Sequence, residues 1–319
     1  MTKRLQILVL AEIEPKDRER LMQAAPGADF SFGEEKFGIA DADIILGQPK
    51  PELLRNAAHL KWLQLSWAGA EPYVMPGILP EHVLLTNVTG AFGLAISEHM
   101  LASALMLTKK LHLYRDNMRQ AVWLDRGNVD AIEGSVVLTV GLGDIGGNFA
   151  RRMKALGAHT IGIRRTEAPK PAYMDEVYLS DRLDDVLPRA DIVALALPGT
   201  ALTRGLFDEA RLSRMKKTAI LINVGRGNAV DCMALAKLLN EGQLGGCSLD
   251  VTDPEPLPPE HPLWRCENAL ITPHISGFYH VRRTYETIVD IFEENLRRYL
   301  AGKPLIHVVD PMTGYCRKD

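Results

Sequence analysis

Short β-prone runs alternate with segments of helical spacing along almost the whole chain, and this alternation constrains the fold more than any other feature. In the first hundred residues the β-prone runs are apolar and fall at 5–10, 43–46, 62–65 and 83–86. Segments with helical spacing lie between them, at 15–25 and 51–58. Because strands that alternate with helices form βαβ units, this part of the chain predicts a parallel sheet.

A second alternation follows and is long enough for a complete doubly wound sheet. It contains six β-prone runs, at 135–140, 160–163, 192–197, 219–223, 246–251 and 270–272. Long helical patterns at 95–119 and 282–300 flank it, and the second stops before Gly302 and Pro304. We therefore expect two Rossmann-like domains of the α/β class, with the chain leaving the first domain and returning to it.

The size and charge of the chain agree with two ordinary globular domains. The 319 residues match a prior of about 150 per domain, and 46% are hydrophobic. Since 37 basic residues stand against 40 acidic ones, the formal charge of −3 argues against nucleic acid or an anionic membrane as a partner. No apolar run approaches the roughly 18 residues of a membrane span, and the apolar start of the chain predicts a first strand rather than a signal peptide.

The cysteines predict the redox compartment. The four residues, Cys232, Cys247, Cys266 and Cys316, lie far apart, with no metal-ligand spacing. We expect reduced thiols in a cytoplasmic protein, and no metal site.

A glycine-rich turn follows the first strand of the second alternation. Residues 141–146 read Gly141-Leu142-Gly143-Asp144-Ile145-Gly146, directly after a predicted strand and before a helical pattern. In that context G-x-G-x-x-G binds a dinucleotide, because the glycines admit the pyrophosphate and the helix N-terminus offers N–H groups to it. The carboxylate of Asp144 opposes phosphate binding unless it points to solvent, which we expect.

The end of the next strand favours NADP over NAD. An acidic residue about 20 positions after the turn normally holds the ribose 2′-hydroxyl of NAD. Here the chain carries Arg164, Arg165 and Thr166 instead. Guanidinium groups pair well with a 2′-phosphate, so we expect NADP to be preferred and NAD to remain possible. The alternative is that both arginines are solvated residues at a strand end.

Three polar residues fall at later strand ends, where open α/β sheets bind their ligands. They are Arg226, Glu255 and His274. Each has an ordinary alternative: a surface arginine, a loop acid or a core histidine.

With these residues in place, the sequence resembles the D-isomer-specific 2-hydroxyacid dehydrogenase family over essentially its whole length. The resemblance rests on the glycine-rich turn, on 223–227, on 253–258 (DPEPLP) with 262–264, and on 272–274. It is most similar to short glyoxylate/hydroxypyruvate reductase-like members, which share the stretch 255–264 and a C-terminal Gly314-Tyr315. No room is left for the regulatory domain that many phosphoglycerate dehydrogenases carry.

The resemblance implies an NAD(P)H-dependent reduction of a small 2-keto acid to the D-2-hydroxy acid. His274 is implied as the proton donor, Glu255 as its supporting carboxylate, and Arg226 as the group that binds and polarises the substrate. Residues 1–100 plus 288–319 would form the substrate-binding domain and 101–287 the dinucleotide-binding domain, with the active site in the cleft between them. A homodimer is also implied.

Further contacts follow by position from the same resemblance. Cofactor contacts are implied for Leu197, Pro198, Val224, Gly225, Asp250, Ser276 and Gly277. The loop after the fourth strand would hold the substrate carboxylate through the N–H groups of Ala68 and Gly69, and Trp67 either lines the pocket or packs under the loop.

Two other functions remain open at this point. One is a dinucleotide-sensing binding protein of corepressor type with the same fold and no physiological turnover. The other is a different Rossmann enzyme such as a methyltransferase, which would have no use for Arg226, Glu255 and His274 together and normally carries the acid that is missing near Arg164.

Overall fold

The computed structural model describes residues 4–278, 281–312, 314 and 316–317; Tyr315 of the resemblance lies outside them. The chain divides into two compact units, 1–91 with 279–319 and 92–278. Both divisions fall nine residues before the expected ones, 91 against 100 and 278 against 287. The difference arises because each long helix belongs to one unit as a whole: 93–108 to the second and 282–300 to the first.

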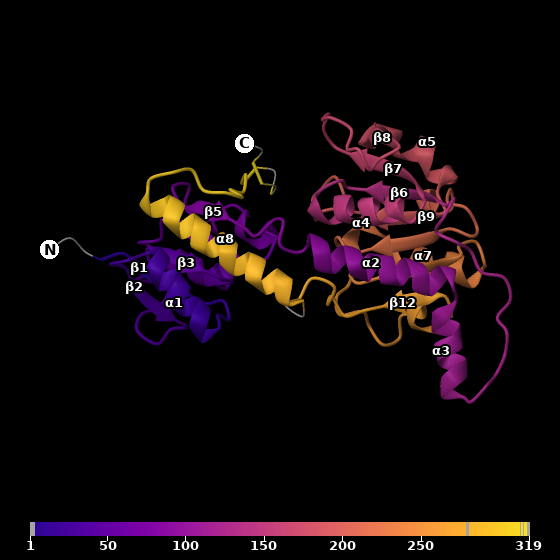
Figure 1. Cartoon of the computed structure of the whole chain (residues 1–319), viewed down its shortest axis with the longest axis horizontal. Helices are drawn as coiled ribbons and strands as arrows, with labels where there is room; N and C mark the ends of the chain where they lie inside the picture. The colour runs from indigo at the N-terminus through magenta and orange to yellow at the C-terminus, as the bar shows by residue number, and fades with distance from the viewer. Residues whose placement is uncertain (1–3, 279–280, 313, 315, 318–319) are drawn as a thin grey trace. The chain divides into compact units, whose positions relative to one another are not determined.

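The first unit is a parallel sheet with helices packed on it (Figure 1). Its strand order is β2-β1-β3-β4-β5, the flavodoxin-like variant of the doubly wound arrangement. The strands are β1 (Gln6–Val9), β2 (Asp29–Phe32), β3 (Ile44–Leu46), β4 (Trp62–Gln64) and β5 (Leu84–Thr86). Helices α1 (Pro15–Ala24) and α8 (Arg282–Leu300) pack against each other, and Pro51–Asn56 is a 3₁₀ helix where an α-helix was expected. A second 3₁₀ turn covers Glu71–Tyr73.

The second unit contains a seven-stranded parallel sheet of order β12-β11-β10-β9-β6-β7-β8. The order reverses between β6 and β9, which is the switch point where dinucleotides bind in Rossmann folds. The strands are β6 (Val136–Val140), β7 (His159–Arg164), β8 (Glu176–Leu179), β9 (Ile192–Leu195), β10 (Ile220–Asn223), β11 (Gly246–Leu249) and β12 (Ala269–Ile271). The helices are α2 (Gly93–Thr108), α3 (Leu111–Arg119), α4 (Asp144–Ala155), α5 (Leu183–Val186), α6 (Glu209–Leu212) and α7 (Cys232–Asn240).

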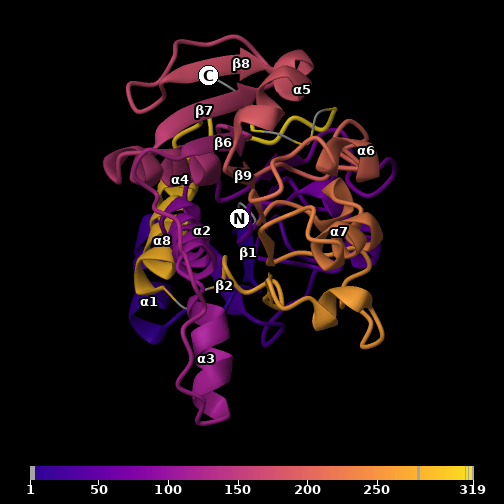
Figure 2. The same ribbon diagram turned by 90° about the vertical axis from the view of Figure 1, so that its right-hand side faces the viewer.

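The predicted helix over 95–119 is in fact two helices. It breaks at Lys110, whose backbone is left-handed with φ 55°. From there α3 leaves the body of the second unit, and both views show it as a protrusion (Figures 1 and 2). No glycine or proline marks the break, so the helical pattern gave no sign of it.

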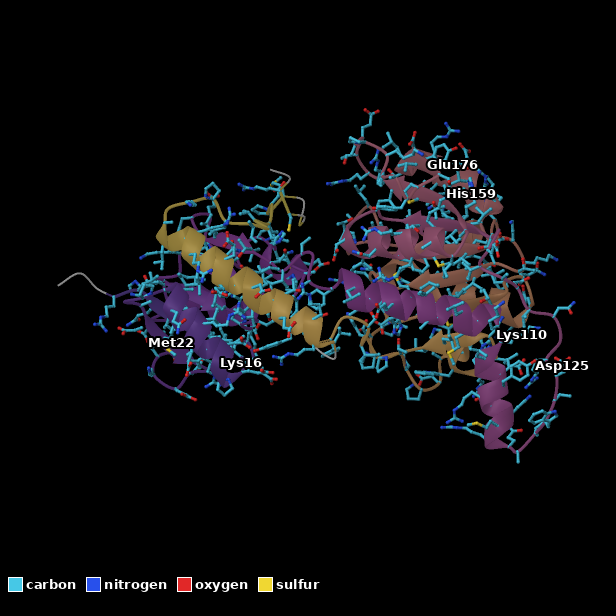
Figure 3. All side chains as sticks on the ribbon, viewed as in Figure 1. Lys16, Met22, Lys110, Asp125, His159 and Glu176 are labelled. Atoms are coloured by element: carbon cyan, nitrogen blue, oxygen red, sulfur yellow. The ribbon has the colours of Figure 1, made fainter. Side chains whose placement is uncertain are left out.

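Two strands escaped the sequence prediction, β2 and β8, and both are edge strands. β8 is only partly buried, and its first residue, Glu176, pairs with charged neighbours rather than with the core. His159 Nε2 lies 2.6 Å from Glu176 Oε1, and Arg189 donates to both oxygens of that carboxylate. Figure 3 shows His159 and Glu176 side by side at this edge.

Each unit has its own apolar core. Among the described residues, no helix is both long and apolar enough to span a membrane. The thiols of Cys232, Cys247 and Cys266 are buried and that of Cys316 is half-buried, and all four are unpaired with one another.

Candidate active site

The glycine-rich turn lies where β6 ends and α4 begins. Gly141 has φ 98°, and a Cβ there would overlap the carbonyl oxygen of Ala196, so only glycine fits this crossing to the next strand. A Cβ on Gly146 would overlap the carbonyl of Gly141, whereas a Cβ on Gly143 would meet nothing within 4 Å. The turn is therefore closed on the protein side and open at Gly143, beside the N-terminal N–H groups of α4. This cradle fits a dinucleotide pyrophosphate.

We expected the side chain of Asp144 to point to solvent, but it lies against the protein instead. Its carboxylate lies against Gly93, the first residue of α2, so closely that a Cβ on Gly93 would overlap it. Asn148 also donates to Asp144 Oδ1 at 2.9 Å. The charge is thus placed at the positive end of a second helix, which favours a carboxylate there.

Arg164, the last residue of β7, and Arg165, which follows it, differ in their contacts. The guanidinium of Arg164 folds back and donates to the carbonyls of Ala168 and Pro169 in its own loop. Arg165 and Thr166 are exposed at the carboxyl end of the strand. Arg164 therefore braces the loop that presents the other two residues.

The loops after β9 and β10 are locked together by glycine. A Cβ on Gly225 would overlap the backbone of Leu197, and a Cβ on Gly227 would overlap the backbone of Thr252 after β11. Gly199 similarly packs on the side chain of Arg226. Three neighbouring strand ends therefore hold a fixed spacing around Arg226, and Leu197, Pro198 and Val224 belong to the loops that these glycines bring together.

The backbone of Arg226 is held by Asn223, a residue whose role the sequence did not suggest. The buried side-chain amide of Asn223 donates to the carbonyl of Arg226 at 3.0 Å and accepts the N–H of Gly225 at 3.1 Å. Both partners are backbone groups of fixed polarity, so an amide is required at position 223. In the sequence this residue is only the first of the stretch 223–227 that carries the resemblance, at the end of a predicted strand.

His274 and Glu255 form a contact pair in the second unit. Nδ1 of His274 lies 2.6 Å from Oε1 of Glu255, and both side chains are more than two-fifths exposed. His274 has a left-handed backbone, with φ 53°, which turns its ring out of the chain direction. With Nδ1 on the carboxylate, Nε2 is the ring atom that can present a proton to a ligand.

Asp250 anchors the turn that carries His274. Its backbone oxygen accepts the N–H of His274 at 2.9 Å, and its buried carboxylate accepts from Thr272, Ile275 and Ser276. Burial raises the pKa of Asp250, but the hydrogen bonds from Ser276, Thr272 and the two backbone N–H groups outweigh burial and hold that pKa below its usual value. Gly277 follows, packed on Ile96 of α2.

In the first unit, the loop after β4 carries Trp67, Ala68 and Gly69. Trp67 is 47% exposed, so its ring does not pack beneath the loop. The carbonyl of Ala68 accepts from the side-chain amide of Asn87, a second asparagine that the sequence did not single out. Among the described residues, no three histidine, cysteine, aspartate or glutamate side chains gather as a metal site would require.

We compared the chain with protein-family models and with known proteins to find which proteins it resembles. The model of the D-isomer specific 2-hydroxyacid dehydrogenase NAD-binding domain matches residues 101–276. A glyoxylate reductase from Korarchaeum cryptofilum is 33% identical over 271 residues, 82% of this chain and 77% of its own. One from Thermofilum pendens is 32% identical over 255 residues, 75% of this chain and 73% of its own.

Solved structures agree over nearly the full length. A D-isomer specific 2-hydroxyacid dehydrogenase family protein from Aeromonas salmonicida superposes with a TM-score of 0.84 at 32% identity, covering 97% of this chain and 100% of its own. An NADPH-dependent glyoxylate/hydroxypyruvate reductase from Sinorhizobium meliloti, in complex with NADP and sulfate, gives 0.83 at 27% identity, with 98% and 100% covered. The chain belongs to the D-isomer specific 2-hydroxyacid dehydrogenase family.

Proposed function

We propose that this protein reduces a small 2-keto acid, of glyoxylate or hydroxypyruvate type, to the D-2-hydroxy acid. The pair of His274 and Glu255 carries the proposal, because reduction of a keto group needs a proton on oxygen and a histidine oriented by a carboxylate supplies one near neutral pH. The glyoxylate reductase relatives support the substrate class.

Each residue then has a defined part. The turn 141–146 and the neighbouring strand ends would hold a reduced nicotinamide dinucleotide, which would supply the hydride for C2 of the keto acid. His274 Nε2 gives its proton to the keto oxygen, while Glu255 on Nδ1 holds the orientation of the ring. Arg226 binds the substrate carboxylate and polarises the keto oxygen through its planar donors. The N–H groups of Ala68 and Gly69 contribute further donors to the substrate carboxylate. That the active site lies in a cleft between the two domains stays a prediction.

The cofactor set remains the one that the sequence predicts. The turn 141–146 would hold the pyrophosphate; Leu197 and Pro198 would lie beside the adenosine; Val224, Gly225, Asp250, Ser276 and Gly277 would lie near the nicotinamide. We propose NADP as the preferred form, with Arg165 and Thr166 on the 2′-phosphate and Arg164 bracing their loop. The similar reductase from Sinorhizobium meliloti, which is in complex with NADP, supports this.

Steady-state reduction of glyoxylate and hydroxypyruvate, with NADPH and NADH in parallel, tests the proposal. We expect turnover, with kcat/KM at least about tenfold higher for NADPH, which corresponds to about 1.4 kcal/mol. His274→Asn should lower kcat about 10²- to 10⁴-fold while NADPH still binds. NADPH binding without turnover of any 2-keto acid would instead favour a dinucleotide-sensing binding protein.

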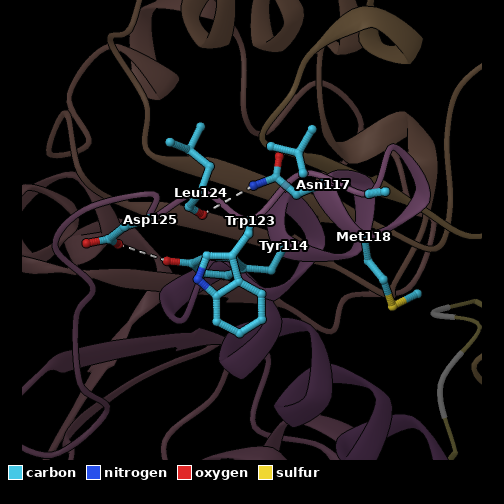
Figure 4. Close-up of a pocket in the computed structure, with 8 residues that line it drawn as sticks. Tyr114, Asn117, Met118, Trp123, Leu124 and Asp125 are labelled. Carbon is cyan, nitrogen blue, oxygen red and sulfur yellow. Dashed lines mark hydrogen bonds between the residues drawn. The ribbon is translucent and has the colours of Figure 1, made fainter.

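We further propose a homodimer in which α3 and the segment after it cover a second copy of the chain. Apolar side chains gather on this protrusion with unusual exposure: Leu111, Met118, Val122, Trp123, Leu124 and Val129. The protrusion is nevertheless ordered internally, because Tyr114 donates to Asp125 and Asn117 to the carbonyl of Leu124 (Figure 4). An ordered apolar surface of this kind is typical of an interface.

Light scattering after gel filtration tests the dimer. Trp123→Glu should give a monomer, whereas Met312→Glu, a change at another highly exposed apolar residue but in the first unit, should leave the mass of the wild type. A monomeric wild type would contradict the proposal.

Location in the cytoplasm remains a proposal from the cysteine pattern.

A further inference from the structure

Two loops of the first unit meet at the carboxyl ends of β4 and β5. One is 65–70, which carries Ala68 and Gly69; the other begins at Asn87, directly after β5. Asn87 is 2% exposed, so its side-chain amide has to find its partners within the protein.

The amide of Asn87 bridges the two loops. Nδ2 donates to the carbonyl of Ala68 at 2.6 Å, and Oδ1 accepts the N–H of Thr89 at 3.1 Å. The hydroxyl of Thr89 and the thiol of Cys316 also lie on Oδ1, at 2.9 and 3.1 Å. Because one partner is a backbone acceptor and the other a backbone donor, neither aspartate nor leucine satisfies both.

The bridge sets the direction of two N–H groups. In a trans peptide unit the C=O and the following N–H point in opposite directions. The carbonyl of Ala68 faces Asn87, and that of Trp67 accepts the N–H of Val88 at 3.4 Å. The N–H groups of Gly69 and Ala68 therefore both point away from 87–88, and within residues 4–278 and 281–312 neither has an acceptor. Two successive N–H groups aimed the same way make a small anion-binding concavity.

We propose that Asn87 is the positioning residue that aims the N–H groups of Ala68 and Gly69 at the substrate carboxylate. The inference takes its ligand, the carboxylate of a 2-keto acid, from the proposed function. It adds the residue that orients the loop to bind that carboxylate. Asn87 touches neither substrate nor cofactor in this role; it acts through the peptide unit of Ala68.

A buried network beneath the loops keeps Asn87 in place. Gln64 at the end of β4 donates to the carbonyls of Leu65 and Asn87 at 2.9 and 3.0 Å. Its own oxygen accepts from Thr86 and from Asn295 of α8, both at 2.8 Å. Since Gln64 is fully buried and satisfied, the starts of both loops are fixed relative to each other.

The test combines a spectroscopic signature with a substrate comparison. In the wild type with NADPH, added oxalate should shift the ¹H–¹⁵N signals of Ala68 and Gly69, and in Asn87→Asp it should not. KM for glyoxylate should rise about tenfold or more in Asn87→Asp, while KM for the uncharged methyl ester of glyoxylate and the Kd for NADPH stay within about twofold. Asn87→Ala is the second variant should the aspartate prevent folding.

Ser31→Ala is the matched control. Ser31 is also buried and also braces a turn, through Gly33 and Lys36, but lies on β2 at the opposite edge of the sheet. It should lower stability without changing the response to oxalate. Wild-type amides that ignore oxalate while glyoxylate is reduced would overturn the inference and leave the proposed function standing. If the amides respond to oxalate but the protein turns over no keto acid, the proposed function falls and the inference stands. A wild-type KM for glyoxylate in Asn87→Asp would also overturn the inference.

Discussion

Nδ1 of His274 donates a hydrogen bond of 2.6 Å to the carboxylate oxygen Oε1 of Glu255. Because the two residues follow different strands, β12 and β11, the contact depends on the spacing of those strand ends rather than on the local sequence. The contact also gives the two ring nitrogens different parts in the proposed reaction. Nδ1 binds the carboxylate, and Nε2 is the nitrogen that would hand a proton to the substrate.

Replacing Glu255 by Gln should lower kcat for keto acid reduction about ten- to hundredfold, the range expected for one lost hydrogen bond to a charged group. The Kd for NADPH should change little, because Glu255 contacts the histidine and no part of the dinucleotide turn. Glu260→Gln, an exposed acid of the same loop, is the control and should behave as the wild type. Equal kcat values for the two variants would remove Glu255 from its role.

Two glycines of the dinucleotide turn should respond differently to alanine. Gly146→Ala places a Cβ on the carbonyl of Gly141 and should lower Tm by several degrees, since 1 kcal/mol corresponds to about 2–4 °C in a unit of this size. Gly143→Ala meets open space and should keep the wild-type Tm but lose affinity for NADPH. Thermal melts with and without NADPH separate the two effects. A Gly143→Ala variant with unchanged affinity would contradict the placement of the pyrophosphate.

Replacements of the two arginines at the end of β7 should differ in their effect on cofactor selectivity. Arg165→Met should raise KM for NADPH at least about tenfold and leave KM for NADH unchanged, because only NADPH offers a 2′-phosphate. Arg164→Met loses donors to Ala168 and Pro169 and should weaken NADPH binding less, while making the loop more open to protease. Steady-state kinetics with both cofactors and limited proteolysis measure these effects. The reverse ranking would assign the phosphate to Arg164.

The edge strand β8 should make stability depend on acid pH. The hydrogen bonds from Arg189 and Tyr178 lower the pKa of Glu176 to about 2, and those from Lys154 and Thr160 lower the pKa of Asp175 to about 2. Both carboxyls therefore stabilise the fold above the unfolded pKa, near 4, and lose that contribution as the pH falls towards 2.

Glu176→Gln should consequently melt a few degrees below the wild type at pH 7, and the difference should shrink as the pH falls from 5 to 3. Circular dichroism melts across that range measure it. Glu241→Gln is the control, because it changes an exposed acid directly after α7, and it should show no such convergence. A difference in Tm that is constant with pH would show that packing rather than charge holds β8.

The central strands were predictable because their residues are buried on both faces and read as continuous apolar runs, as in β9 and β10. The edge strands β2 and β8 were missed because polar residues interrupt their apolar runs, Asp29 and Ser31 in β2 and Glu176 in β8. Glu176 reads as a loop residue until its partners His159 and Arg189 are known. The break at Lys110 left no trace either, since a left-handed lysine differs from a helical one only in its backbone.

The site was predictable only in part, for a related reason. Motifs along the chain pointed to Gly141, Arg226 and His274, whose chemistry is visible in their side chains. The residues that hold others in place, Asn87 and Asn223, are ordinary asparagines in the sequence. Their importance comes from which backbone groups lie opposite them, and that depends on how distant strands are spaced.

The first unit is assembled from both ends of the chain. Its sheet comes from residues 6–86, but helix α8 begins only at residue 282. Two further contacts also need the end of the chain, because Val308 pairs with Thr86 and the thiol of Cys316 bonds to Asn87. During synthesis, the uninterrupted stretch 92–278 can complete its sheet as it emerges from the ribosome. The earlier strands have to wait for α8, so the part of the chain that is made first belongs to the unit that finishes folding last.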